Sequence, residues 1–319
     1  MILILSRTDD YDTNLVIEWL RFYKIPFFRL NDEELMNGLT KLKYFNNEIY
    51  LSNDLEIKLN EIKVVWFRKF GFLTDFENDL GRNSDIMNYV TNEFKSLSTY
   101  LIDLLRDKKW LFNRKLVVSK LEMLDKANKA KLNCPNTLIC TSKSDLNIFF
   151  LKNNKSLITK SIGDAKYIKH ENNCFNFQTH IITDIRKFKS KFSPSFFQEY
   201  VEKEIEIRTF YLDGKCYSMA IFSQNNEKTK LDFRNYDLQN PNRFVPYKLP
   251  DLLEEQIDEF MKSINLNTGS LDIIKSSKNG KFYFLEVNPS GQFGMTGNPC
   301  NYNLHQKVAN YLKKTLYEN

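Results

Sequence analysis

Short apolar segments alternate with amphipathic ones along this chain, and this alternation restricts the possible folds more than any other feature. Residues 2–6 and 27–30 have the apolar character of short buried strands, and a helix-compatible run over 13–24 lies between them. Over residues 84–106, apolar side chains recur at three-to-four spacing, which predicts an amphipathic helix. Strands that alternate with helices are typical of α/β domains. We therefore predict an α/β unit over residues 1–110.

The rest of the chain also mixes strands and helices, so the predicted class is α/β with α+β character. Asp213-Gly214 separates two apolar runs and predicts a β-hairpin, and Asn279-Gly280 marks a second strand pair. Residues 224–250 are polar and predicted to be irregular. Further strands are expected at 44–51, 55–59, 62–70, 138–140, 157–160, 167–169, 196–201, 205–212, 216–222, 271–274 and 281–287, and further helices at 120–131, 251–264 and 304–316.

The composition excludes several classes of protein. Of the 319 residues, 42% are hydrophobic and 14% aromatic, which is enough to fold. No apolar run approaches the ~18 residues of a membrane helix, and the run at 2–6 is too short for a signal peptide, so we expect a soluble cytoplasmic protein. Five scattered cysteines and three histidines argue against a disulfide framework, a zinc site and His-based catalysis. The net charge of +6 suits an anionic small molecule or an acidic peptide.

Ionisable residues inside apolar strands carry most of the functional information. Asp272 lies in an apolar strand, and Glu286 lies in another, two residues before Asn288. A lone buried carboxylate is costly, so it normally pairs, titrates or binds a metal. Strand periodicity places Glu286 and Asn288 on one face, and Asp272 can face them if the two strands pair. Two carboxylates and an amide oxygen suit Mg²⁺, although a salt bridge or a strand-end hydrogen bond is the simpler alternative for each residue.

Two lysines lie where phosphate-binding cations are needed. Lys160 ends an apolar strand before a short Gly-containing loop, and Lys120 begins a helix, where exposed backbone N–H groups also attract anions. The alternative for each is an ordinary surface lysine. The sequence contains neither the P-loop pattern nor the Gly-x-Gly-x-x-Gly fingerprint, so a nucleotide would have to be bound in another way.

These residues together resemble the ATP-grasp superfamily. The resemblance extends through Lys120, Lys160, residues 197–201, Glu206, Arg208, Asp272 and residues 285–288. It implies an ATP-grasp fold in which two α/β lobes sandwich ATP and a pre-grasp α/β domain precedes them. The implied domains are 1–110 for the pre-grasp domain, 111–200 for the central lobe and 201–319 for the C-terminal lobe with the metal site.

The resemblance also implies roles for individual residues. The cofactors would be ATP and two Mg²⁺ ions. Lys120 and Lys160 would contact the phosphates, with Lys160 and Arg208 as catalytic residues at the transferred phosphate. The remaining implied contacts are backbone groups of Glu199 and Val201 with adenine, Glu206 with the ribose hydroxyls, and Asp272, Glu286 and Asn288 with the metal ions.

Within this superfamily the chain is most similar to peptide maturases of the graspetide or microviridin type, in particular the grasp-with-spasm ligases. Residues 65–69, 223–224, 229–234 and 288–294 carry this resemblance. It implies that Asp232, Arg234 and Arg68 contact a peptide substrate, because Arg binds carboxylates in a bidentate manner. The alternatives are an ion pair within the loop for Asp232 and Arg234, and core packing of Trp66 with a surface position for Arg68.

The predicted function is an ATP-dependent ligase that forms macrocycles in a precursor peptide. It would phosphorylate Asp or Glu side-chain carboxylates and couple them to Thr or Ser hydroxyls, or to Lys amines. Two alternatives remain: a RimK-like ligase that adds an amino acid to a protein tail or small acid, and a nucleotide-binding scaffold without turnover. The expected partner is a precursor peptide with a leader and a core rich in Thr, Asp and Glu, with a homodimer as a further possibility and no nucleic-acid or membrane partner.

Overall fold

The computed structural model describes residues 1–71, 84–112, 119–163, 167–170, 173–176, 179–224 and 237–318. Contacts divide the chain into two compact units. The first unit consists of Met1–Val117, Asn265–Gly269 and Pro289–Asn319, and the second of Val118–Ile264 and Ser270–Asn288. The predicted domain boundaries near 110 and 200 stay a prediction. The sequence did not indicate that the C-terminal residues belong to the same compact unit as the N-terminus.

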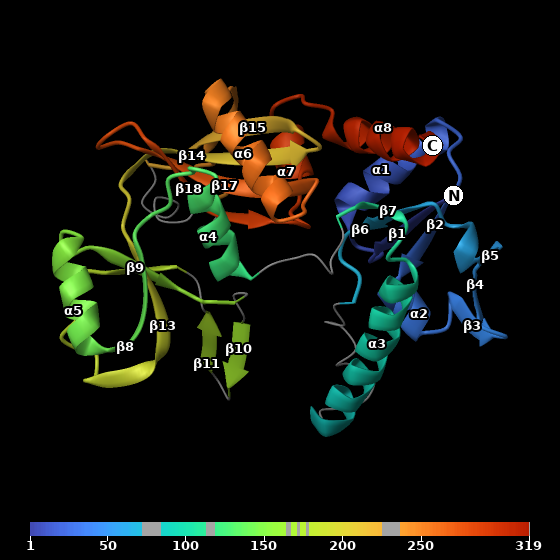
Figure 1. Ribbon diagram of the computed structural model, residues 1–319, viewed down its shortest axis with the longest axis horizontal. Helices are drawn as coiled ribbons and strands as arrows, with labels where there is room; N and C mark the ends of the chain where they lie inside the picture. Colours follow the sequence, from blue (N-terminus) through green and yellow to red (C-terminus); the bar gives the residue numbers. More distant parts are fainter. Residues whose placement is uncertain are drawn as a thin grey trace. The chain divides into compact units, whose positions relative to one another are not determined.

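The first unit is built on a parallel sheet with the strand order β2-β1-β6-β7. Its strands are β1 (Ile2–Ser6), β2 (Phe27–Asn31), β6 (Val64–Phe67) and β7 (Lys109–Leu111). Every residue of β1 and β6 is buried, as expected for parallel strands covered on both faces. Helix α1 (Tyr11–Phe22) packs against α8 (Leu304–Tyr317), and Figure 1 draws the two side by side. The predicted α/β character of the N-terminal segment is confirmed.

Smaller elements complete the first unit. These are α2 (Asp32–Met36), the 3-10 helix η1 (Leu59–Glu61), α3 (Ser84–Leu104), α7 (Gly294–Gly297), and an antiparallel sheet of β3 (Lys41–Phe45), β4 (Glu48–Ser52) and β5 (Glu56–Lys58). The prediction of one strand over 44–51 is wrong. Asn46 and Asn47 adopt positive φ values of 49° and 62° and form a tight turn between β3 and β4. Asn tolerates this left-handed conformation better than most residues do.

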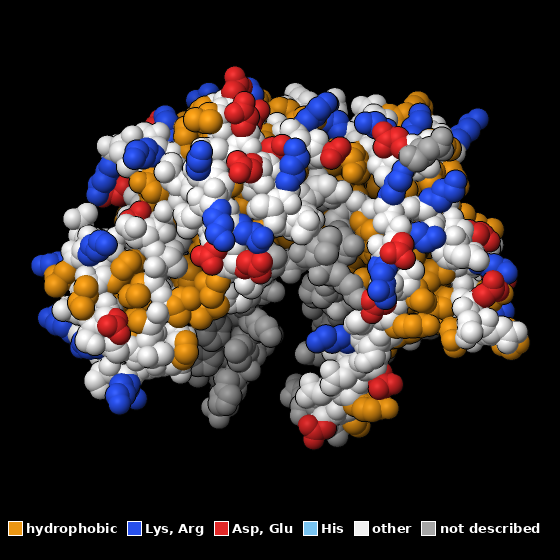
Figure 2. All heavy atoms as spheres, in the orientation of Figure 1, with side chains coloured by type: hydrophobic (Ala, Val, Ile, Leu, Met, Phe, Trp, Pro, Cys, Tyr) orange, Lys and Arg blue, Asp and Glu red, His pale blue; other side chains and the backbone are white. Residues whose placement is uncertain are grey.

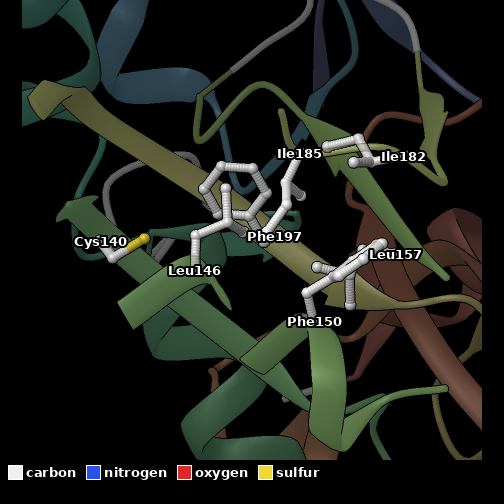
Figure 3. Packing of buried hydrophobic residues seen from close by; sticks show 7 residues of the cluster. All are labelled: Cys140, Leu146, Phe150, Leu157, Ile182, Ile185 and Phe197. Atoms are coloured by element: carbon white, nitrogen blue, oxygen red, sulfur yellow. The ribbon is translucent and has the colours of Figure 1, made fainter. Parts of the chain in front are cut away.

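The second unit contains two antiparallel sheets, and the first has the strand order β12-β9-β13-β8. Its strands are β8 (Thr137–Ser142), β9 (Leu157–Lys160), β12 (His180–Ile182) and β13 (Lys191–Glu199). Helix α5 (Lys143–Lys152), which the sequence did not predict, contributes Leu146 and Phe150 to the core beneath this sheet. Figure 3 shows these two side chains with Leu157 and Phe197 from neighbouring strands. A short hairpin of β10 (Tyr167–His170) and β11 (Asn173–Asn176) is separate from the sheet.

The second sheet of this unit has the order β16-β15-β14-β17-β18. Its strands are β14 (Lys203–Leu212), β15 (Lys215–Phe222), β16 (Arg243–Tyr247), β17 (Thr268–Ser276) and β18 (Phe282–Asn288). The hairpin predicted at Asp213-Gly214 is confirmed, with φ values of 45° and 83°. Strand β16 corrects the prediction that 224–250 is irregular throughout. Helix α6 (Asp251–Ser263) contacts β15 and α4 (Lys120–Lys129), and α4 contacts β18 (Figure 1).

The surface shows no segregation of charge on the face drawn in Figure 2, where acidic and basic side chains are interspersed. Among the described residues, no helix has both the length and the apolar character that a membrane crossing requires.

Candidate functional site

The pairing of β17 with β18 brings the three predicted metal ligands to neighbouring positions. Asp272 lies directly opposite Glu286, and Ser270 lies opposite Asn288. Directly opposed residues of an antiparallel pair have Cβ atoms about 5 Å apart on one face, so the two carboxylates and the amide share that face. The register shifts by one residue immediately after Asp272. Such bulges redirect side chains and are common beside functional sites.

Both predicted phosphate-binding lysines reach the same carboxylate oxygen. Lys120 Nζ lies 3.4 Å, and Lys160 Nζ 3.9 Å, from Glu286 Oε2. Lys120 is the first residue of α4, where the Ser119 hydroxyl caps the helix by accepting the Glu122 N–H at 3.2 Å. Lys160 is the last residue of β9. The two cations therefore come from separate elements and converge on one anion.

Arg208 completes the set of charges. Its Nη1 donates to Asp272 Oδ1 at 2.7 Å, and its side chain is 9% exposed. Its Nε is buried and has no hydrogen-bond partner among the described residues. An unpaired buried donor costs roughly 1–3 kcal/mol, so a bound oxygen ligand would satisfy a group that the described residues leave unsatisfied. We call Lys120, Lys160, Arg208, Asp272 and Glu286 the β18 cluster.

Ser270 is a neighbouring residue that the sequence did not single out. It is 1% exposed, it lies across from Asn288, and its hydroxyl also has no partner within the described part of the chain. A serine in an apolar strand is only a weak sequence signal, because serine is common in strands and pairs easily with backbone groups.

The predicted ribose ligand Glu206 lies in a second buried polar group. Glu206 Oε1 accepts from Lys203 Nζ and from Ser223 Oγ, each at 2.7 Å. The predicted adenine contacts lie next to it in sequence. Glu199 ends β13, its backbone N–H donates to the carbonyl of Asn136 at 2.9 Å, and Val201 is half-buried in the link to β14. Because the backbone N–H of Glu199 is already bonded, we predict that Glu199 contacts the base through its backbone carbonyl group.

Arg68 belongs to the first unit and lies in a buried ion-pair network. Its Nε contacts Asp10 Oδ2 at 3.0 Å, its Nη2 contacts Asp12 Oδ2 at 3.6 Å, and its Nη1 donates to the carbonyl oxygens of Ser290 and Gly291. Arg68 is only 3% exposed. A contact between Arg68 and a peptide stays a prediction. Asp232 and Arg234, the other two predicted peptide contacts, lie outside the described residues.

Asp12 holds the other end of this network. Its two carboxylate oxygens accept the backbone N–H groups of Phe293 and Gly294, each at 2.9 Å, and Oδ1 also contacts His305 Nε2 at 2.9 Å. A Cβ on Gly294 would approach Asp12 Oδ1 to 2.4 Å, so any larger residue here would force the Asp12 carboxylate to move. We call Asp10, Asp12, Arg68 and His305 the Arg68 network. No pattern in the sequence indicates this network, because Asp12 resembles an ordinary first-turn helix residue.

Burial opposes ionisation of Asp10, but the charge and the hydrogen bonds of Arg68, together with the bond from Thr13, outweigh it and lower the pKa of Asp10 to about 2. The Thr13 hydroxyl donates to Asp10 Oδ2 at 2.6 Å. Asp10 is therefore ionised at neutral pH and paired with Arg68.

Similarity to solved structures decides the fold. No protein-family model and no curated protein matches the sequence. Among solved structures, a RiPP-associated ATP-grasp ligase of Chryseobacterium gregarium, in complex with ADP and a leader and core peptide, matches with a TM-score of 0.84 and 22% identity, over 98% of this chain and 96% of that chain. Macrocyclase MdnC of Microcystis aeruginosa MRC, bound with precursor peptide MdnA, matches with a TM-score of 0.83 and 22% identity, over 99% of this chain and 100% of that chain. The chain has the ATP-grasp fold.

A third similar structure is the ATP-grasp ligase PsnB, complexed with a phosphomimetic variant of a minimal precursor, Mg and ADP. It has a TM-score of 0.76 and 16% identity, over 99% of this chain and 98% of that chain. The ATP-grasp fold predicted from the sequence is confirmed. At these identities the likeness establishes the fold, and the roles of single residues stay predictions.

The residues of the β18 cluster fit the cofactors that an ATP-grasp fold implies. Among the described residues there is no group of three or more His, Cys, Asp and Glu side chains that could hold a metal. Asp272 and Glu286 are two carboxylates, and Asn288 supplies an amide oxygen, which together form a small all-oxygen donor set. Such a set suits Mg²⁺, which keeps several water and phosphate ligands besides one or two carboxylates. The Nε of Arg208, which has no hydrogen-bond partner among the described residues, suits a phosphate oxygen.

Proposed function

We propose that the protein is an ATP- and Mg²⁺-dependent ligase that forms macrocycles in a ribosomally made precursor peptide. The observation that carries the proposal is the convergence of Lys120 and Lys160 on Glu286, beside the Arg208–Asp272 pair. Cations and metal-binding oxygens held together in this way suit phosphoryl transfer, where catalysis consists mainly of positioning and charge neutralisation. The Chryseobacterium ligase contains ADP and a leader and core peptide, MdnC contains its precursor peptide, and PsnB contains a precursor variant, Mg and ADP, which supports the same interpretation.

When bound, ATP supplies the phosphoryl group that converts a carboxylate into an acyl phosphate, and Mg²⁺ neutralises the charge of the triphosphate. The residues of this chain bind and position these groups. Lys120 and Lys160 hold the phosphates, and Arg208 contacts the transferred group through its Nε, for which the described part of the chain offers no partner. Asp272, Glu286 and Asn288 hold two metal ions, and Glu199, Val201 and Glu206 hold the nucleoside. Asp232, Arg234 and Arg68 are each proposed to contact the peptide.

The chemistry balances in two steps. An Asp or Glu side-chain carboxylate of the peptide attacks the γ-phosphorus, which gives an acyl phosphate and ADP. A Thr or Ser hydroxyl, or a Lys amine, then attacks the acyl carbon, loses its proton, and releases inorganic phosphate. Each ring consumes one ATP, and the peptide loses one water.

We also propose that the protein is cytoplasmic and forms a homodimer.

The test is to incubate the purified protein with its cognate precursor, ATP and Mg²⁺. We expect ADP to form much faster with the precursor than without it, and mass spectrometry to show a loss of one water per ring. Equal ADP formation with and without the precursor would contradict the peptide substrate. Turnover saturated by free amino acids, with no mass loss in the peptide, would support the RimK-like alternative. Peptide binding without any ADP would support a scaffold.

A further inference from the structure

The Glu206 carboxylate is held on one oxygen by two donors. Lys203 Nζ and Ser223 Oγ each lie 2.7 Å from Glu206 Oε1. The Lys203 side chain is 3% exposed and Ser223 is 0% exposed. Gln224 Nε2 donates in turn to Ser223 Oγ at 3.1 Å. The acceptor and its donors therefore form a short buried chain of polar groups.

The sheet register explains why Ser223 lies near Glu206. Glu206 on β14 pairs with Ile221 on β15, and Ser223 lies two residues beyond Ile221. Residues two apart in a strand share a face, so Ser223 is a diagonal neighbour of Glu206 on the same face of the sheet. Lys203 is the first residue of β14, two positions after Val201. The group thus begins directly after the link that we propose to contact adenine.

A buried lysine–carboxylate pair contributes little to stability, because the cost of desolvating both charges offsets their attraction. Its benefit is geometric. A carboxylate fixed by two donors keeps one orientation, and its oxygens can accept hydrogen bonds from ligand hydroxyls. Carboxylates that bind ribose hydroxyls in this manner occur at other nucleotide sites.

We propose that Lys203 and Ser223 are positioning residues that hold Glu206 for the ribose hydroxyls, and that they thereby set the preference for ribonucleotides over deoxyribonucleotides. The inference rests on the proposed function, since it requires a nucleotide at this site. It assigns roles to Lys203 and Ser223 that the sequence pattern did not indicate.

The test compares ADP with 2′-deoxy-ADP, each titrated calorimetrically in the presence of Mg²⁺. We expect the wild type to prefer ADP. Lys203→Met should lose about tenfold in ADP affinity, the size expected for a hydrogen bond to a charged group, and much less in 2′-deoxy-ADP affinity. The preference for ADP should therefore shrink. Lys203→Arg should restore part of it, because guanidinium keeps a donor and the charge.

Two further variants keep the test decisive. Ser223→Ala retains the Lys203–Glu206 pair and should reduce the preference in the same direction by a smaller factor, so it decides the question if Lys203→Met does not fold. Lys215→Met, at an exposed lysine that begins β15, is the matched control and should leave both affinities unchanged. A wild-type preference retained by both Lys203→Met and Ser223→Ala would overturn the inference. Failure of the wild type to bind ADP at all would instead contradict the proposed function.

Discussion

Two groups of paired charges, one in each unit, differ in how completely their members are satisfied. In the Arg68 network, Asp10 is 0% and Asp12 3% exposed, and the guanidinium contacts both carboxylates and two backbone carbonyls. In the β18 cluster, Asp272 is 19% and Glu286 28% exposed, and Arg208 has an unpaired donor among the described residues. The first arrangement is closed, because its charged groups satisfy one another and stabilise the folded chain, whereas in the second a donor of Arg208 has no partner among the described residues. The contrast teaches that unsatisfied hydrogen-bonding capacity, more than charge, distinguishes a cluster that can take a ligand directly. A peptide would reach Arg68 only by displacing one of its present partners.

The largest expected effect comes from breaking the closed network. Asp10→Ala removes the carboxylate that pairs with Arg68 and leaves a buried guanidinium undercompensated, which should cost ~3–5 kcal/mol of unfolding free energy. Urea unfolding measures the change. The matched control is Glu18→Ala, which breaks an ion pair whose side chains are 66% and 67% exposed and should cost less than ~1 kcal/mol. Equal losses in the two variants would show that the network is not structural.

The β18 cluster should respond in the opposite way, with lost activity and retained stability. Glu286→Gln keeps the shape of the side chain but removes the negative charge proposed to hold metal. We expect the peptide-dependent rate of ADP formation to fall by ~100–1000-fold, as for loss of one preorganised electrostatic group. The melting temperature should change little, because Glu286 is partly exposed. Normal turnover in Glu286→Gln would show that Glu286 is not part of the active site.

Substitution of Gly294 tests how tightly the Arg68 network holds Asp12. The Asp12 oxygen that a Cβ would meet is fixed by the Gly294 N–H and by His305, so it cannot move away without losing both bonds. Gly294→Ala should therefore cost ~1–3 kcal/mol, as overpacking of a filled core does. Gly163→Ala is the control, because no atom of the described residues lies within 4 Å of its added Cβ. Chemical denaturation of both variants checks the difference, and an unchanged Gly294→Ala would mean that Asp12 is free to shift.

The pH dependence of stability tests the pairing of Asp10. Its folded pKa is about 2, below the usual value of 3.8, so its ionised form stabilises the folded state above pH 4. That contribution, ~2 kcal/mol, is lost as the pH falls from about 4 to about 2. The difference in unfolding free energy between the wild type and Asp10→Asn should shrink over this range. A difference that stays constant with pH would contradict the lowered pKa.

The residues of the β18 cluster could be predicted from the sequence because they break a local pattern. Asp272 and Glu286 are charges inside apolar strands, and a charge in such a position indicates either pairing or ligand binding. The Arg68 network could not be predicted, because its members Asp12 and His305 are 293 positions apart and have no unusual neighbours in sequence. Only the folded chain brings them together.

Helix α5 shows a similar limit for secondary structure. Leu146 and Phe150 are buried, but Ile148 and Leu151 on the same helix are 67% and 56% exposed. Apolar residues on both faces hide the helical period, so the segment has no amphipathic signal. Strand β16 was missed for a different reason, because its Pro246 and its polar flanks resemble a loop.

The most direct test of the account is calorimetric titration of ADP into the wild type, Glu286→Gln and Lys160→Met, with and without Mg²⁺. If the β18 cluster binds nucleotide and metal, Mg²⁺ should strengthen ADP binding to the wild type but not to Glu286→Gln. Lys160→Met should bind ADP more weakly than the wild type, both with and without Mg²⁺. In the absence of Mg²⁺, Glu286→Gln should bind ADP more tightly than the wild type, because its lysines are no longer paired with a carboxylate. Three proteins with the same affinity and the same response to Mg²⁺ would contradict the assignment of this cluster as the nucleotide and metal site.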